Sequence, residues 1–212
     1  MNMTPTVEAA SAIAAELAQI GKAFYARGWA LGASGNLSAV LSRDPLRLAI
    51  TSSSVDKGEL SADHILQVDD NGIVVQGAGR PSAETLLHLA VTRLRGAGAV
   101  LHTHSVWSNI LSGAYWKDRG LSIEGFEMLK GLEGVSTHEH REWLPIIENS
   151  QDMTRLARLV EETLTRHPEA HAFLLLRHGL YTWGKDLPEA KRHVEILEFL
   201  LEVSGRVYCA AR

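Results

Sequence analysis

Ala99-Val100-Leu101-His102-Thr103-His104 is an apolar run that ends in two histidines separated by one residue. A short apolar run of this kind is typical of a buried strand. Side chains alternate along a strand, so His102 and His104 leave the same face with their Cα atoms about 6.6 Å apart. Burying two imidazoles is costly unless something compensates them. One metal ion can do so, because zinc–nitrogen bonds are about 2.0–2.1 Å long.

A third histidine, His178, follows a second apolar run at residues 172–176. A lone histidine is more often a core residue satisfied by its neighbours. Two strands that each end in histidine instead predict a metal ion at the edge of a sheet. Three histidine ligands leave one coordination position free, which is typical of a catalytic rather than a structural metal site.

The remaining histidines carry weaker signals. His138-Glu139-His140 repeats the spacing of the first pair, but its neighbours are polar, so it is interpreted as a solvated loop. Five histidines occur singly and are interpreted as structural or surface residues: His64, His88, His167, His171 and His193.

The composition is that of an ordinary globular protein, with 212 residues, 45% hydrophobic and 22% charged. A net charge of −4 gives no reason to expect nucleic acid or an anionic membrane as a partner. The only cysteine is Cys209, so no intrachain disulfide can form. Charged residues interrupt the alanine-rich segment 1–29, which therefore does not resemble a signal peptide, and no stretch is long enough to span a bilayer. We expect a cytoplasmic protein.

No linker, repeat or charge run divides the chain, so residues 1–212 are predicted to form a single domain. Strand and helix patterns interleave and a hairpin is present, which predicts an α/β fold with a mixed sheet covered by helices. The main expected elements are a helix from Thr4 that ends at Gly28, a strand at 46–51, a hairpin at 65–75, a helix capped by Ser82 that runs to Arg95, and helices at 151–167 and 186–208.

Two glutamates are candidate acid/base groups, because a carboxylate beside a divalent ion can move protons. Glu84 lies in the first turn of a predicted helix, where the helix dipole alone also favours a carboxylate. Glu127 stands between apolar neighbours, and the alternative for it is a surface residue on a short helix.

Two glycine- and serine-rich segments, 32–38 and 51–54, are candidates to bind phosphate together with Ser82. Small residues let backbone N–H groups approach an anion, and hydroxyl groups add donors. Each segment alone is more often a turn. They form a phosphate pocket only if the fold brings them together.

Five motifs occur in an order that resembles the class II aldolase/adducin family: Gly-Ala-Ser-Gly-Asn-Leu-Ser (32–38), Ile-Thr-Ser-Ser-Ser (50–54), Arg-Pro-Ser-Ala-Glu (80–84), Leu-His-Thr-His-Ser (101–105) and Arg-His-Gly (177–179). The resemblance implies a three-layer α/β/α sandwich around a mixed, largely antiparallel sheet. It also implies one zinc ion per subunit on His102, His104 and His178. A homotetramer with active sites near subunit boundaries is the assembly it implies.

The resemblance also assigns roles to single residues. In the aldolases of the family, the glutamate at the position of Glu84 is a metal ligand and acid/base, whereas dehydratases need not keep it. Glu127 matches the acid/base of the dehydratases. The phosphate-binding segments match Asn36, Ser53, Ser54 and Ser82.

Three further segments, at 127–131, 145–149 and 177–184, are similar to the dehydratases of this family. They imply a hydro-lyase of methionine salvage that converts 5-methylthioribulose 1-phosphate to 2,3-diketo-5-methylthiopentyl 1-phosphate and water. The alternatives are a sugar-phosphate aldolase or pentulose-phosphate 4-epimerase, and a non-enzymatic adducin-like interaction module. An interaction module does not need three metal-binding histidines, so these residues favour an enzyme.

Overall fold

The structure is a computed structural model that describes residues 7–211. The helix start predicted near Thr4 lies outside the described residues. Helix α1 covers Val7–Ala26, and Gly28 follows it with a φ of 74°. Glycine adopts this left-handed conformation without steric cost, so the helix ends where the sequence predicts.

The other elements follow in chain order. The helices are α2 (Thr85–Arg95), α3 (Val106–Ala114), α4 (Met153–Arg166) and α5 (Leu187–Ala210). The strands are β1 (Asn36–Arg43), β2 (Leu46–Thr51), β3 (Ile65–Val68), β4 (Val74–Gln76), β5 (Ala99–Thr103), β6 (Gly120–Ile123), β7 (Glu142–Ile147), β8 (Ala172–Leu175) and β9 (Gly179–Gly184). Short 3-10 helices are η1 (Lys57–Glu59), η2 (Ala62–His64), η3 (Trp116–Asp118) and η4 (Glu127–Gly131).

Within residues 7–211 the strands form one nine-stranded sheet in the order β4-β3-β2-β1-β5-β9-β8-β7-β6. Neighbouring strands run antiparallel, except that β7 and β8 are parallel. The mixed, largely antiparallel sheet is therefore confirmed. The predicted strand at 46–51 is β2, and the predicted hairpin is β3 and β4.

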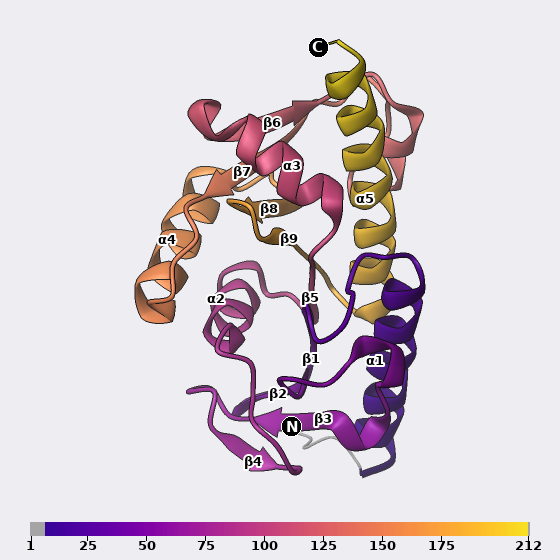
Figure 1. The fold of residues 1–212 in the computed structure, drawn as a ribbon. Coiled ribbons are helices and arrows are strands. Elements are labelled where there is room, and N and C mark those ends of the chain that lie inside the picture. The colour runs from indigo at the N-terminus through magenta and orange to yellow at the C-terminus, as the bar shows by residue number, and fades with distance from the viewer. Residues whose placement is uncertain (1–6, 212) are drawn as a thin grey trace.

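Helices cover both faces of this sheet (Figure 1). Helices α2 and α4 pack together on one face, and α1, α3 and α5 lie on the other. Alternation along β5 divides its side chains between the two layers, because Val100 packs with Leu87 of α2 while Leu101 packs with Leu17 of α1. His102 therefore shares the α2 face with Val100.

Strand β1 is an element that the sequence analysis does not predict, because its first residues belong to the glycine- and serine-rich segment 32–38. Its apolar residues Leu37, Ala39 and Leu41 do alternate, and they are buried in the cluster that includes α1. Strand β1 lies in the middle of the sheet between β2 and β5, and its register pairs Asn36 with His102. The glycine- and serine-rich segment 32–38 thus places Asn36 beside the predicted metal site.

The apolar run at residues 172–176 forms β8, which ends at Leu175, and a tight turn leads from it into β9, which begins at Gly179. Arg177 adopts a φ of 50° in the turn. A Cβ at Gly179 would lie 2.0 Å from the carbonyl oxygen of Thr103, so only glycine permits this close approach of the turn to β5. The turn places His178 beside the end of β5.

No helix in the described part of the chain is both long and apolar enough to cross a membrane.

Candidate metal centre

His102 occupies a fully buried position near the end of β5. Its ring stacks on Tyr181 of the paired strand β9, with the centroids 3.9 Å apart. Its Nδ1–H donates to the carbonyl oxygen of Leu180 at 2.9 Å. This bond fixes the tautomer and leaves the Nε2 lone pair directed away from the strand.

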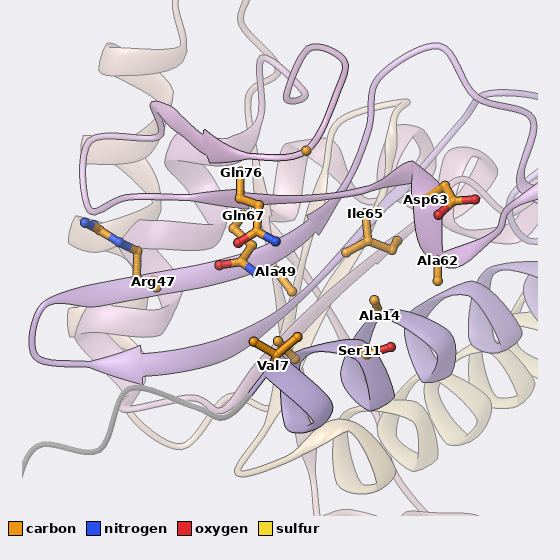
Figure 2. A pocket seen from close by; sticks show the side chains of 12 residues that line it. Val7, Ser11, Ala14, Arg47, Ala49, Ala62, Asp63, Ile65, Gln67 and Gln76 are labelled. Carbon is orange, nitrogen blue, oxygen red and sulfur yellow. The ribbon is translucent and has the colours of Figure 1, made fainter.

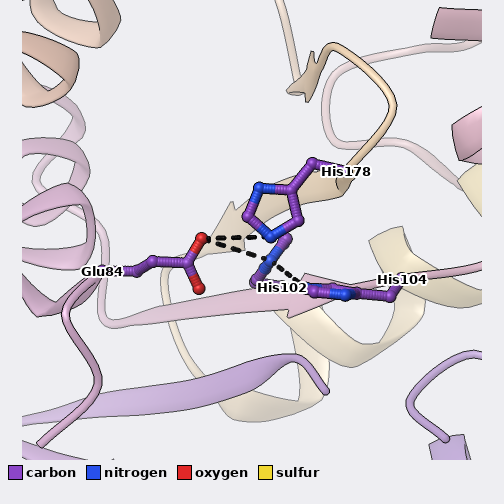
Figure 3. A group of neighbouring side chains, drawn as sticks. All are labelled: Glu84, His102, His104 and His178. Carbon is purple, nitrogen blue, oxygen red and sulfur yellow. Dashed lines mark hydrogen bonds and ion pairs between the residues drawn. The ribbon is translucent and has the colours of Figure 1, made fainter. Parts of the chain in front are cut away.

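The three predicted histidines come together at this point (Figure 3). The ring centroid of His104 lies 4.5 Å from that of His102 and 4.5 Å from that of His178. The centroids of His102 and His178 are 5.0 Å apart. Asn109 of α3 holds the turn in place by donating to the carbonyl oxygen of His178 at 2.9 Å. The fold therefore brings together His102 of β5, His104 just after the end of β5, and His178 from a hairpin turn that is distant in sequence.

Glu84 completes the group from the opposite side. It occupies the N-cap position of α2, which begins one residue later, whereas the sequence analysis gives the cap to Ser82. The Glu84 Oε1 atom lies 3.3 Å from Nε2 of His178 and 3.7 Å from Nε2 of His102. One ligand atom from each of the four residues lies within 4.8 Å of the others.

The electrostatics of the group favour neutral imidazoles. Burial lowers the pKa of His102 well below its usual value, and the neighbouring His104 and His178 add to the effect. Burial and His178 lower the pKa of His104 to about 4. Both rings are therefore neutral at pH 7, which is the form that binds metal.

Two observations show that these side chains fit a divalent metal ion. The Nε2 atoms of His102 and His104 face each other at 2.7 Å, and a proton or a cation must lie between such a pair. The Oε1 atom of Glu84 is buried and has no hydrogen-bond partner. Buried polar atoms are rarely left in this state, and a cation would satisfy it. Three imidazoles and one carboxylate form a donor set that suits zinc and other transition metals.

Two of the predicted phosphate-binding residues, Asn36 and Ser82, lie next to this group. Asn36 donates through Nδ2 to Ser82 Oγ at 3.1 Å and to Glu84 Oε2 at 2.6 Å. The backbone N–H of Ser53 donates to the carbonyl oxygen of Arg80, which joins the loop after β2 to the segment before α2. The Oγ atoms of Ser53 and Ser54 are 3.5 Å apart. The fold thus brings together the segments that carry the predicted serines and Asn36.

His88 is a functional candidate that the sequence analysis misses. It is fully buried on α2, bonds Ser38 Oγ at 2.7 Å through Nδ1, and contacts Asn36 Oδ1 through Nε2. Burial lowers its pKa to about 3, so the ring stays neutral. Because His88 follows Glu84 by four residues, the two share a helix face, and this spacing is the signal that could have identified it.

Glu127 lies elsewhere in the chain. Its carboxylate is 71% exposed and pairs with Lys130 at 2.8 Å. Helix η4, which carries it, packs against α5, on the face of the sheet opposite α2. The hydrogen bond and charge of Lys130 lower the pKa of Glu127. Its other charged neighbour is His138, whose Nδ1 lies 3.7 Å from Glu127 Oε2. Within one chain, these contacts of Glu127 are made away from His102, His104 and His178.

A cavity of about 530 Å³ is separate from the metal centre. Figure 2 shows it between the start of α1 and the strands β2 and β3. Its charged lining residues are Arg47 and Asp63, and none of the predicted site residues lines it.

The chain matches the family described as Class II Aldolase and Adducin N-terminal domain over residues 15–204. Its relatives include a methylthioribulose-1-phosphate dehydratase from Marinobacter nauticus, 42% identical over 89% of this chain and 90% of that protein. A methylthioribulose-1-phosphate dehydratase from Methylococcus capsulatus is 43% identical over 94% of this chain and 96% of its own length.

Solved structures with the same fold include an L-fuculose-1-phosphate aldolase from Thermus thermophilus, with a TM-score of 0.74 and 25% identity. The match covers 96% of this chain and 100% of that protein. YgbL from Escherichia coli has a TM-score of 0.75 and 29% identity over 92% of this chain and 88% of its own.

Proposed function

Because the chain belongs to the class II aldolase and adducin family, we propose that it is a metal-dependent dehydratase of 5-methylthioribulose 1-phosphate, with 2,3-diketo-5-methylthiopentyl 1-phosphate as product. The observation that carries this proposal is the identity of 42–43% to methylthioribulose-1-phosphate dehydratases over nearly the whole chain. The cluster of Glu84 with three histidines supplies a suitable site. Methionine salvage is the pathway in which this reaction would act.

Zinc is the ion that we propose for the site, held by His102, His104 and His178. When bound, it would supply positive charge beside the C2 carbonyl of the ketose and stabilise the negative charge that develops during proton removal. Glu84 lies against two of the ligand histidines, where it either completes the ligand set or accepts a proton. Asn36, Ser53, Ser54 and Ser82 would bind the phosphate through neutral donors.

The reaction removes the C3 proton and the C4 hydroxyl group, which leaves as water, and the enol that remains becomes the second ketone. A hydroxyl group leaves readily only when it receives a proton. We assign this donation to Glu127. In the isolated chain Lys130 favours its ionised form, so the donor role requires a less exposed setting, where desolvation raises the pKa of a carboxyl.

A contact between subunits would supply that setting. Met128 and Phe199 lie beside Glu127 and are 40% and 45% exposed, an apolar surface that another copy of the chain can cover. We therefore propose a homotetramer in which Glu127 of one subunit acts at the histidines of its neighbour. In a shared site of this kind, Glu127 can act on a substrate bound at the histidines even though the two lie apart within one chain.

The activity itself is tested by measuring product formation from 5-methylthioribulose 1-phosphate, with and without a chelator. We expect turnover that the chelator abolishes and zinc restores. Absence of the diketone product from metal-loaded protein would refute the dehydratase. Aldol cleavage, the reaction for which Glu84 is suited in the family's aldolases, would instead release dihydroxyacetone phosphate from this substrate.

The shared site is tested by co-expressing two differently tagged variants, Glu127→Gln and His102→Gln. Each variant alone is expected to be nearly inactive. In a mixed oligomer, a subunit with intact histidines meets a neighbour with intact Glu127, so activity returns. If both residues act within one subunit, the purified mixed oligomer stays as inactive as the single variants.

A further inference from the structure

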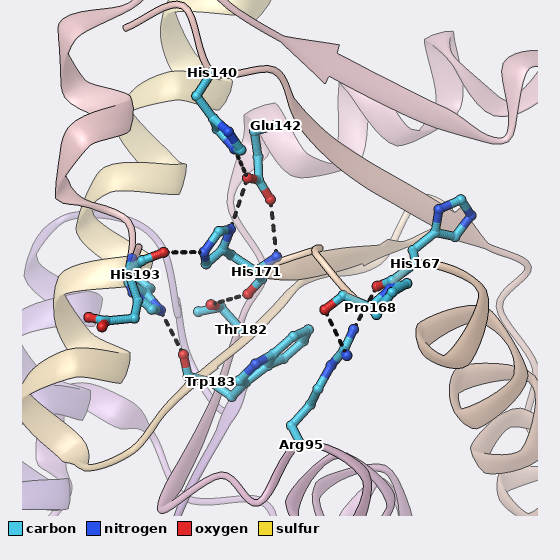
Figure 4. Close-up of polar contacts among 10 residues, drawn as sticks. Arg95, His140, Glu142, His167, Pro168, His171, Thr182, Trp183 and His193 are labelled. Carbon is cyan, nitrogen blue, oxygen red and sulfur yellow. Dashed lines mark hydrogen bonds and ion pairs between the residues drawn. The ribbon is translucent and has the colours of Figure 1, made fainter. Parts of the chain in front are cut away.

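A second group of histidines and a carboxylate lies at the other end of β8 (Figure 4). It consists of His140, Glu142 and His171, and one ligand atom from each lies within 4.8 Å of the others. His140 Nε2 and His171 Nδ1 each lie 2.9 Å from Glu142 Oε2. His140 lies in a partly exposed loop and His171 is held by hydrogen bonds, as the sequence predicts, but their meeting at Glu142 is not predicted.

The strand register explains why these residues meet. Glu142 is the first residue of β7 and His140 lies two residues before it, with its ring turned to the same side of the chain as the Glu142 carboxylate. His171 immediately precedes β8, which runs parallel to β7. Parallel neighbours begin at the same edge of a sheet, and this edge therefore collects all three side chains.

Surrounding hydrogen bonds already orient the ligand atoms. The Nε2–H of His171 donates to the carbonyl oxygen of Glu133 at 2.8 Å, which leaves Nδ1 directed at Glu142. The backbone N–H of His171 donates to Glu142 Oε1 at 3.0 Å and leaves Oε2 for the two rings. Outer bonds of this kind fix the tautomer and orientation of metal-binding side chains.

We propose that His140 Nε2, Glu142 Oε2 and His171 Nδ1 form a second binding site for a divalent transition metal ion, independent of the centre at Glu84. Two imidazoles and one carboxylate are a donor set that zinc, cobalt and nickel accept. Ligand atoms in a tetrahedral zinc site are on the order of 3.3 Å apart. Each ring nitrogen, now 2.9 Å from Glu142 Oε2, therefore needs to move from that oxygen by only a few tenths of an ångström.

Access and burial also suit an ion. Glu142 is 1% exposed, and a buried carboxylate requires a positive partner. His140 is 28% exposed, so the site opens to solvent on its side. Without metal, the partner is a protonated His171, because both of its ring nitrogens then donate, to Glu142 and to Glu133. Metal binding would displace that proton.

The test is a titration of metal-free protein without a histidine tag, using Zn²⁺ followed by elemental analysis and Co²⁺ followed by absorption. We expect two equivalents per chain for the wild type and one for His140→Gln. His140 is the chosen position because it is partly exposed, whereas replacing the buried Glu142 can unfold the protein. His138→Gln is the matched control, since it alters the same loop outside the site, and it should keep two equivalents.

A second measurement separates the two sites. In a His102→Gln background the remaining equivalent belongs to the second site, so Zn²⁺ should raise the melting temperature of that variant. Adding His140→Gln should remove the shift. A single equivalent in the wild type would show that the group is only a hydrogen-bonded ion pair. Two equivalents retained in His140→Gln would show that the second ion binds without His140, and this too would overturn the proposed site. Either result would leave the proposed dehydratase untouched.

Discussion

The two histidine groups differ in how completely hydrogen bonds satisfy them. At the Glu84 centre, two ring nitrogens face each other and a buried carboxylate oxygen has no hydrogen-bond partner. At the Glu142 group, the carboxylate accepts from both rings and from a backbone N–H. The first arrangement is costly without a cation, whereas the second is stable with protons alone. The side chains therefore lie similarly close together in the two groups, but only the Glu84 centre needs a cation to satisfy its buried polar atoms.

Two buried carboxyl groups show the same contrast in their pKa values. Burial would raise the pKa of Glu142, but hydrogen bonds and charge from His171 and His140 outweigh it and lower the pKa. Glu198 of α5 lies behind the Glu84 centre, where Thr103 donates to it, and burial raises its pKa to about 7. A carboxyl group with imidazole neighbours stays charged, and one with only hydroxyl neighbours resists ionisation.

The largest effect is expected from breaking the Glu84 centre with His102→Gln. This change should remove the bound metal at that centre and lower turnover by about 10²–10³-fold, because charge stabilisation in the site is lost. Elemental analysis and steady-state kinetics measure the two results. His167→Gln, on a half-exposed histidine at the end of α4, is the control and should keep both metal and activity. Full metal occupancy at that centre in His102→Gln would remove His102 from the ligand set.

Much of the Glu84 centre can be predicted from sequence because its signals are local. The alternation along residues 99–104 fixes that His102 and His104 share a face, and the apolar run before His178 marks another strand. The helix start before α2 likewise places Glu84 at the end of an element. These local signals do not show that the ends of the two strands and of α2 lie close together. The resemblance of the motifs to the family supplies that information.

The Glu142 group cannot be found in the same way. His140 and Glu142 alone do not indicate a metal site in the sequence. His171 lies beside them only because of the parallel register of β7 and β8, and this register depends on the whole sheet. The H-x-H spacing at His138 points to the wrong pair of residues. Strand β1 is not predicted for a related reason. The glycines and serines around it obscure the alternation of its apolar residues, and packing against the rest of the fold holds this segment as a strand.

A smaller effect, on stability, is expected from Glu198→Gln. The folded-state pKa of about 7 exceeds the ordinary value of 4.5, so the carboxyl group stabilises the fold below pH 4.5 and loses this contribution as the pH rises through 7. The difference in unfolding free energy between wild type and variant should change by about 3 kcal/mol over this range. Urea unfolding at several pH values measures it. A constant difference would mean that folding does not shift the pKa of Glu198.

The smallest effect is expected from replacing a glycine that packs against the Glu84 centre. A second glycine away from the centre serves as a control for backbone strain alone. Gly35 and Gly32 both have positive φ, 71° and 58°, so alanine costs about 1 kcal/mol or more at either position. A Cβ at Gly35 would lie 2.6 Å from the carbonyl oxygen of His102, while one at Gly32 meets nothing within 4 Å. Gly35→Ala should therefore lose about 1–3 kcal/mol more than Gly32→Ala in urea unfolding.

Because the clash falls on the backbone of His102, Gly35→Ala should also weaken metal binding at the Glu84 centre, and Gly32→Ala should not. The Glu142 group lies at the other end of β8, so its metal equivalent should survive both changes. Equal losses of stability, with metal bound normally by both variants, would mean that β5 shifts to admit the methyl group. The close approach of Gly35 would then contribute nothing to the position of His102.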